Sequence, residues 1–167
     1  MSAQWRAAEH EAPRLAPLTI RDLDALMKVE NAAYAYPWTR GNFIDSLAAG
    51  YAAWQLVDGQ DTLLGYFIAM PGAQEMHLLN LTVAPPHQGQ GHARRMLDAL
   101  AALCRDAGLP QLWLEVRASN MRARALYARY GLIEVGRRKA YYPAQTLLHP
   151  QRREDAVVMS LQLDPIA

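Results

Sequence analysis

The stretch from residue 75 to residue 116 constrains the fold most strongly, because it reads as a strand, a glycine-rich loop, a helix and a second strand. The first strand, "EMHLLNLTV" (75–83), stops before Pro85-Pro86, since proline cannot donate to a sheet ladder. The second strand, "LWLEV" (112–116), has the apolar character of a buried strand. This order predicts a βαβ unit. Its loop, "HQGQGH", follows the first strand at its carboxyl end, where ligands of open α/β sheets gather.

The helix of this unit has one apolar stripe, and it ends at Gly108 and Pro110. The stripe consists of Met96, Leu97, Leu100, Leu103, Cys104 and Ala107. Because Cys104 belongs to the stripe, we expect it to pack in the core and not to act as a nucleophile.

The remaining segments alternate between strands and helices. We expect strands over 15–20, 51–57, 63–70, 132–138 and 155–163, with a hairpin turn at Asp58-Gly59. Helical spacing predicts helices over 21–34 and 121–130, the second capped by Ser119 or Asn120 and ended by Gly131. A further short helix begins after Thr39 and places Phe43, Ile44 and Leu47 on one face. The chain is therefore predicted to form one α/β domain over residues 15–167, with helices on the faces of a mixed sheet and a flexible extension over 1–14.

Composition excludes several classes of function. The formal net charge of +1 argues against general binding to nucleic acid, which needs a concentrated basic surface. A single cysteine cannot form an internal disulfide or a cysteine-based zinc site, and His77, His87 and His92 are not spaced as metal ligands. No apolar run approaches the length of a membrane span. We therefore expect a cytoplasmic protein without a metal, a membrane or a nucleic acid as partner.

The glycine-rich loop is a candidate anion site, because a helix start exposes unpaired N–H groups and a partial positive charge. The loop lacks the lysine and hydroxyl of a nucleoside triphosphate-binding loop. Small residues at Gly89, Gly91 and Ala93 let the backbone wrap closely around a guest, and Arg94 and Arg95 add positive charge. A pyrophosphate would fit. From the spacing alone, it is equally possible that the loop is only a flexible turn and that the two arginines are solvated.

The segment "LTVAPPHQGQGHARRML" resembles the acyl-CoA signature of the GNAT superfamily of N-acetyltransferases, in which Gln or Arg is followed by x-x-Gly-x-Gly/Ala. Gln88, Gly91 and Ala93 match that pattern. The resemblance implies a mostly antiparallel mixed sheet, acetyl-CoA as co-substrate and no metal. It also implies that the pantetheine arm pairs with Leu81, Thr82 and Val83, where one N–H polarises the thioester carbonyl. The CoA pyrophosphate would be held by Gln88, Gly89, Gln90, Gly91, His92, Ala93 and Arg94.

Four further segments, "NAAYAYPWTRGNF", "LWLEVRASNMRARALYARYGL", "YYP" and "REDAVVMSL", are similar to the bacterial ribosomal-protein-alanine N-acetyltransferases of the RimI type. That family acetylates the N-terminal α-amine of a small-subunit ribosomal protein, and a monomer is favoured. The resemblance implies that Glu115 is the general base, Tyr127 the general acid and Asn120 a CoA contact. It implies peptide contacts at Glu30, Trp38, Tyr141 and Tyr142.

Glu115 and Tyr127 carry the functional groups that acetylation of an amine requires. An α-amine has a pKa about 2.5 units below that of a lysine amine, which favours its neutral form by roughly 3.5 kcal/mol. One carboxylate, acting directly or through water, is then a sufficient base. Glu115 stands in an apolar strand, where a charge is costly unless it faces a cleft or, alternatively, forms a salt bridge with an arginine. Tyr127 follows Asn120 by two helical turns and could instead simply pack in the core.

Two segments differ from the similar sequences, so the sequence of the preferred peptide stays undetermined. The segment "AQTLLHPQR" (144–152) is longer than in the similar sequences, and the extension before Leu15 is unusual. Two other functions remain alternatives at this point: acetylation of a lysine or a small-molecule amine on the same scaffold, and CoA binding without catalysis.

Overall fold

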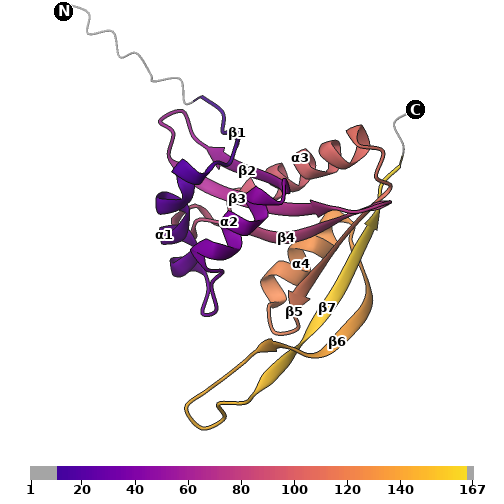
Figure 1. The fold of residues 1–167 in the computed structure, drawn as a ribbon. Coiled ribbons are helices and arrows are strands. Elements are labelled where there is room, and N and C mark those ends of the chain that lie inside the picture. The colour runs from indigo at the N-terminus through magenta and orange to yellow at the C-terminus, as the bar shows by residue number, and fades with distance from the viewer. Residues whose placement is uncertain (1–10, 165–167) are drawn as a thin grey trace, which may run out of the picture.

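A computed structural model describes residues 11–164, and within them the elements follow the predicted order (Figure 1). Seven strands form one sheet in the order β1-β2-β3-β4-β5-β7-β6, and only β4 and β5 pair in parallel. The sheet is therefore mixed and mostly antiparallel, as expected. The strands are β1 (Arg14–Pro17), β2 (Ala52–Val57), β3 (Leu63–Pro71), β4 (Glu75–Val83), β5 (Gln111–Arg117), β6 (Ile133–Pro143) and β7 (Arg153–Gln162). The helices are α1 (Leu23–Ala33), α2 (Arg40–Ala48), α3 (His92–Asp106) and α4 (Met121–Tyr130), with short 3-10 turns η1 (Ile20–Asp22) and η2 (Pro85–His87).

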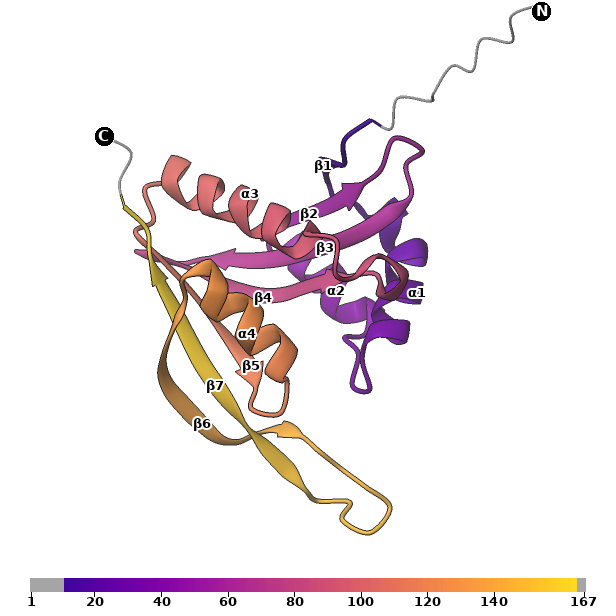
Figure 2. The same ribbon diagram turned by 180° about the vertical axis from the view of Figure 1, so that it is seen from behind.

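The helices cover both faces of the sheet. Helices α1 and α2 lie on one face, and α3 and α4 lie on the other, as the two opposite views show (Figures 1 and 2). Four residues of the predicted stripe of α3, Met96, Leu97, Leu100 and Cys104, are buried and pack on the sheet. Of the other two, Leu103 is partly buried and Ala107, the C-cap, is exposed. A second cluster joins α1 and α2 to the other face of β3 through Leu26, Phe43, Tyr66 and Ile68, among others. Two apolar layers therefore hold the sheet from opposite sides.

Side-chain caps explain where the helices begin. Thr39 accepts a hydrogen bond of 3.1 Å from the N–H of Asn42 at the start of α2. Asn120, and not Ser119, caps α4, because its Oδ1 accepts from the N–H of Ala123 at 3.1 Å. On α2, Ile44 is exposed although it was expected on the apolar face, and Ser46 is buried.

The N-terminal boundary differs from the prediction. The expected strand over 15–20 is observed over Arg14–Pro17, because the backbone N–H and hydroxyl of Thr19 both bond the carboxylate of Asp22 and turn the chain into η1. Arg14, which we placed in the flexible extension, already pairs with Val57. Residues 1–10 of that predicted extension lie outside the described residues. No helix in the described part of the chain has the length and apolar composition required to cross a lipid bilayer.

Strands β4 and β5 pair only over their first halves. The parallel register runs from Glu75 opposite Gln111 to Leu78 opposite Leu114 and then ends. At the same point the register of β4 with β3 shifts, so that Leu79 has no partner there. Beyond this bulge β4 and β5 diverge, as the view from behind shows (Figure 2). The edge of β4 over residues 79–83 is thus left without β5, which opens the sheet between two layers of helices.

The close packing of β3 on β4 yields a first prediction. A Cβ on Gly65 would lie 2.6 Å from the carbonyl oxygen of Thr82 and 2.9 Å from Cε of Met96, so that β4 would have to shift. We expect Gly65→Ala to lower the free energy of unfolding by about 1–3 kcal/mol in urea titrations. Gly136→Ala is the matched control, because nothing lies within 4 Å of its Cβ position, and its effect should stay within about 0.5 kcal/mol. Equal stabilities of the two variants would contradict the packing argument.

Candidate functional site

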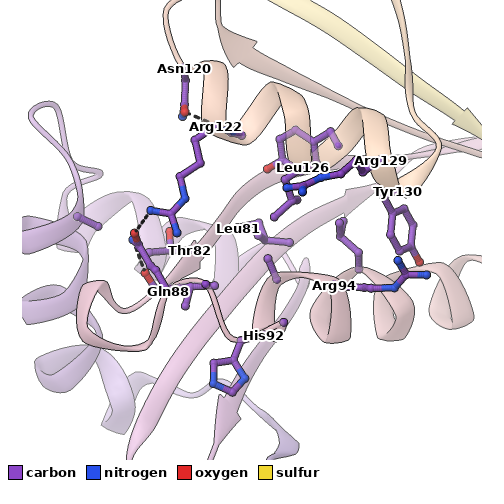
Figure 3. Close-up of a pocket in the computed structure, with 18 of the residues that line it drawn as sticks. Leu81, Thr82, Gln88, His92, Arg94, Asn120, Arg122, Leu126, Arg129 and Tyr130 are labelled. Atoms are coloured by element: carbon purple, nitrogen blue, oxygen red, sulfur yellow. Dashed lines mark hydrogen bonds between the residues drawn. The ribbon is translucent and has the colours of Figure 1, made fainter.

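A cavity of about 690 Å³ lies where β4 and β5 diverge, between the end of β4, the glycine-rich loop, α3 and α4 (Figure 3). Its size suits a small molecule or cofactor. Ten of the eleven predicted cofactor residues line it, and Gln90 does not. Those ten are Leu81, Thr82, Val83, Gln88, Gly89, Gly91, His92, Ala93, Arg94 and Asn120.

The loop at the floor of this cavity requires glycine at two positions. Gly89 and Gly91 have φ angles of +75° and +82°, in the left-handed region that side chains disfavour. Gly91 is the N-cap of α3, and the first turn of that helix contains no acidic residue. The unpaired N–H groups of that turn and the helix dipole therefore favour an anion beside the loop.

Arginines complete the positive character of the cavity. Arg94 comes from α3, and Arg122 and Arg129 come from α4. Arg122 donates to Oε1 of Gln88 at 2.8 Å, and Nε2 of Gln88 donates to the carbonyl of Val83 at 3.2 Å, so that α4, the loop and β4 are tied together (Figure 3). No lining residue in the described chain carries a carboxylate. Sequence reasoning missed Arg122 and Arg129, because nothing local indicates which face of α4 meets the loop.

Two tyrosines stand at the inner end of the cavity. Tyr127 on α4 is 8% exposed, and its burial raises the pKa of its hydroxyl, with smaller contributions from Tyr34 and Tyr142. The hydroxyl of Tyr34 lies 2.7 Å from Oγ1 of Thr82 and donates to the carbonyl of Leu81 at 3.2 Å. Burial raises the pKa of Tyr34 to about 12. Both phenols therefore stay protonated at neutral pH, and Tyr34, which the sequence did not single out, fixes the free edge of β4.

Glu30 lies inside the protein and not on a surface groove. It is 1% exposed, and its carboxylate accepts from the backbone N–H of Trp38 at 2.9 Å, from the hydroxyl of Tyr66 and from Nδ2 of Asn80. Asn80 in turn accepts from the hydroxyl of Thr82 at 2.7 Å. A buried polar chain therefore links the loop between α1 and α2 to the free edge of β4.

Glu115 lies on the other side of the opening, immediately after the last residue of β5 that pairs with β4. Its side chain is 6% exposed, and Nε of Arg138 lies 3.3 Å from its Oε1. A hydrogen bond to Glu115 is the main cause that raises the pKa of Tyr141, and the charge of Glu115 adds to the effect of burial in raising the pKa of Tyr142. The salt bridge to an arginine, one of the two alternatives for this carboxylate, is thus present, and two predicted peptide residues stand beside it.

The loop between α1 and α2 meets the β6–β7 hairpin above Glu115. Tyr36 donates to the carbonyl of Gln145 at 3.1 Å. The guanidinium of Arg117 lies between two rings, 4.8 Å from the centroid of Tyr36 and 4.6 Å from that of Tyr142, and it also bonds Glu154 at 2.9 Å. Trp38, a predicted peptide contact, is half-buried at the base of the same loop, with its ring 5.1 Å from that of Phe43. Tyr36 and Arg117 were not predicted.

The arrangement separates two chemical environments. The cavity on the α3 and α4 side is basic and suits an anionic ligand with an arm along β4. The opposite side holds a carboxylate among tyrosines and arginines, which suits a cationic or amine-bearing group. Tyr127 lines the cavity, and Tyr34 and Tyr142 both add to the effect of burial in raising the pKa of its hydroxyl.

Comparison with known proteins agrees with this geometry. Residues 23–132 match the Acetyltransferase (GNAT) family. The chain is 36% identical to the ribosomal protein bS18-alanine N-acetyltransferase of Haemophilus ducreyi over 86% of its own length and 95% of the relative. The crystal structure of the ribosomal-protein-S18-alanine N-acetyltransferase from Escherichia coli is 34% identical, with a TM-score of 0.82 over 93% of this chain and 96% of that one.

A more distant likeness concerns the fold alone. The NatC complex bound to Gag peptide and CoA is 20% identical, with a TM-score of 0.74 over 91% of this chain and 99% of that one. The match over residues 23–132 and the identities above 30% across most of the chain show that the chain belongs to the GNAT family of N-acetyltransferases.

Proposed function

We propose that this N-acetyltransferase transfers the acetyl group of acetyl-CoA to the N-terminal α-amine, on alanine, of a small-subunit ribosomal protein in the cytoplasm. The observation that carries the proposal is the opening between β4 and β5, with a basic cavity on one side and Glu115 on the other. The names of the relatives at 34–36% identity support the substrate.

The loop and the free edge of β4 would hold the acyl donor. The pyrophosphate would accept hydrogen bonds from the backbone around Gly89 and Gly91 and from the first turn of α3, with Arg94 and Arg122 beside it. The pantetheine arm would take the place that β5 vacates along Leu81–Val83. A backbone N–H of that edge would then polarise the thioester carbonyl, as preorganised donors do in acyl transfer.

The acceptor amine would enter from the side of Glu115. The carboxylate takes a proton from the ammonium, directly or through water, and the neutral nitrogen attacks the thioester carbon. When the carbon–sulfur bond breaks, the leaving thiolate takes the phenolic proton of Tyr127, and the second proton lost by the attacking nitrogen, as the amide forms, returns the phenolate of Tyr127 to the phenol. The raised pKa of Tyr127 keeps that proton available at neutral pH.

The peptide would run between the loop after α1 and the β6–β7 hairpin. Tyr141 and Tyr142 would contact its first residues, because both stand beside Glu115. Trp38 would contact the peptide from the base of the loop between α1 and α2. Glu30 would act indirectly, since its carboxylate holds the backbone N–H of Trp38.

The choice of amine tests the substrate class. With acetyl-CoA and a peptide that begins with alanine and also contains lysine, we expect acetylation of the α-amine, because about 2.5 pKa units separate the two amines. Mass spectrometry of the product locates the group. Acetylation of lysine with a free α-amine would favour the alternative on the same scaffold. CoA binding in calorimetry without any turnover would favour a non-catalytic module.

Conservative substitutions test the two catalytic assignments. Glu115→Gln removes the base and Tyr127→Phe removes the acid, and each substitution preserves the shape of the side chain. We expect each variant to lower kcat by about 100-fold or more. The matched controls are Glu134→Gln, at an exposed ion pair on β6, and Tyr51→Phe, both away from the cavity. Steady-state kinetics with the peptide should leave both controls near the wild-type rate. Full turnover in the two test variants would refute the assignments.

A pair of glycine variants tests the cofactor loop. Gly91→Ala places a side chain at φ +82° beside the expected pyrophosphate, and we expect CoA affinity to fall by about tenfold, or 1.4 kcal/mol. Gly50→Ala imposes similar backbone strain at φ +76° on the turn between α2 and β2, so it controls for strain alone. Calorimetric titration with CoA should show an unchanged Kd for Gly50→Ala. Equal losses of affinity in both would contradict the proposed role of the loop.

A further inference from the structure

His77 lies directly behind Glu115, on β4 opposite Trp113 of β5. Its imidazole is stacked on the indole of Trp113, with ring centroids 3.6 Å apart and planes 12° from parallel. Nε2 of His77 lies 3.9 Å from Oε1 of Glu115. A movement of about 1 Å would make this a hydrogen bond. The His77 side chain is 16% exposed, compared with 6% for Glu115, so the imidazole has more contact with solvent than the carboxylate has.

The groups that face His77 keep it neutral. Burial is the main cause that lowers its pKa below 6.5, and the positive charge of Arg138 on β6 acts in the same direction. Glu115 on β5 and Glu75 on β4 act in the opposite direction but do not outweigh these effects. At neutral pH the ring therefore has a free nitrogen that can accept a proton.

We propose that His77 receives the proton that Glu115 takes from the substrate amine and passes it to solvent. This inference rests on the proposed function. An N–H bond of the ammonium breaks as an O–H bond forms on Glu115, and that O–H bond breaks as an N–H bond forms on His77. The imidazolium then releases a proton to water, which restores the neutral ring and the carboxylate. His77 does not contact the substrate. It acts only through Glu115, from which it accepts the proton.

Transfer of the proton to His77 would help because the basicity of an imidazole is closer to that of the amine than the basicity of a carboxylate is. An α-ammonium titrates near pH 7.7–8.0, and an ordinary carboxylate is a much weaker base than the amine that it must deprotonate. An ordinary imidazole, with a pKa of about 6.5, is closer to the amine in basicity than a carboxylate, with a pKa of about 4.3. Burial of His77 reduces that advantage but keeps the ring in the neutral form that accepts a proton at pH 7. Delivery of the proton to His77 therefore makes deprotonation easier at neutral pH than Glu115 alone would. Above about pH 9 most of the amine is already neutral in solution, so the benefit disappears.

The competing interpretation is that His77 only fills space against Trp113. His77→Phe separates the two interpretations, because it keeps a flat ring on the indole and removes both nitrogens. His87→Gln is the control, since it removes an imidazole that does not line the cavity. Thermal unfolding and CoA titration of each variant show whether the fold and the donor site are intact.

The experiment measures kcat for wild type, His77→Phe and His87→Gln between about pH 6.5 and pH 9. We expect His77→Phe to be slower by about tenfold near pH 7 and by less than about twofold near pH 9, with His87→Gln unchanged throughout. In His77→Ala, added imidazole should restore part of the rate near pH 7, whereas it should not rescue Glu115→Gln. A packing role would give a deficit that is independent of pH and of imidazole.

A wild-type rate in His77→Phe near pH 7, or a deficit of constant size across the pH range, would overturn the inference. A wild-type rate in Glu115→Gln would overturn it as well, because no proton would then pass through that carboxylate. Failure of the proposed substrate is visible separately, as absent α-amine acetylation by the wild type. The His77 comparison is then made on whichever amine the wild type acetylates.

Discussion

The loss of pairing between β4 and β5 after Leu78 and Leu114 is the constraint on which the rest of the molecule depends. Two parallel strands that stayed paired would bury their polar edges against each other and leave no opening in the sheet. The bulge at Leu79 ends the pairing and directs Asn80 and Thr82 toward α1. An unpaired polar edge is costly unless it finds partners. Here the same edge lines the cavity.

The two sides of the opening differ in charge, and under the proposed function this difference would direct the acyl donor to one side and the amine to the other. The cavity side has arginines and helix N–H groups without a carboxylate among its lining residues in the described chain. On the other side, Glu115 is paired with Arg138, whose side chain is 52% exposed. An ion pair with a half-exposed partner contributes at most about 1 kcal/mol, because water screens it. In the proposed mechanism an incoming ammonium would therefore replace Arg138 at the carboxylate at little cost, which a fully buried pair would not allow.

Much of this fold could be predicted from the sequence, since its elements have strong local signals. The apolar stripe of α3, the cap at Thr39 and the turn that follows Asp58 each depend on residues close together in the chain, although the left-handed residue of that turn is Asp61 and not Gly59. The opening could not be predicted, because a one-residue bulge leaves no periodic signature in β4. Tyr34, Arg122 and Arg129 were missed for a related reason, since their place depends on how distant helices pack. The resemblance to a family indicated Glu30, but only the tertiary structure places it in the interior.

The interior position of Glu30 explains how the opening is kept in one shape. Its carboxylate is shared by Trp38 of the loop between α1 and α2, Tyr66 of β3 and Asn80 of β4. From Asn80 the chain of hydrogen bonds continues through Thr82 to Tyr34. A buried carboxylate is tolerated only when its donors are all in place, so the network disfavours partial rearrangements. The wall that would hold the acyl donor and the loop that would hold the peptide are therefore fixed relative to each other by one buried charge.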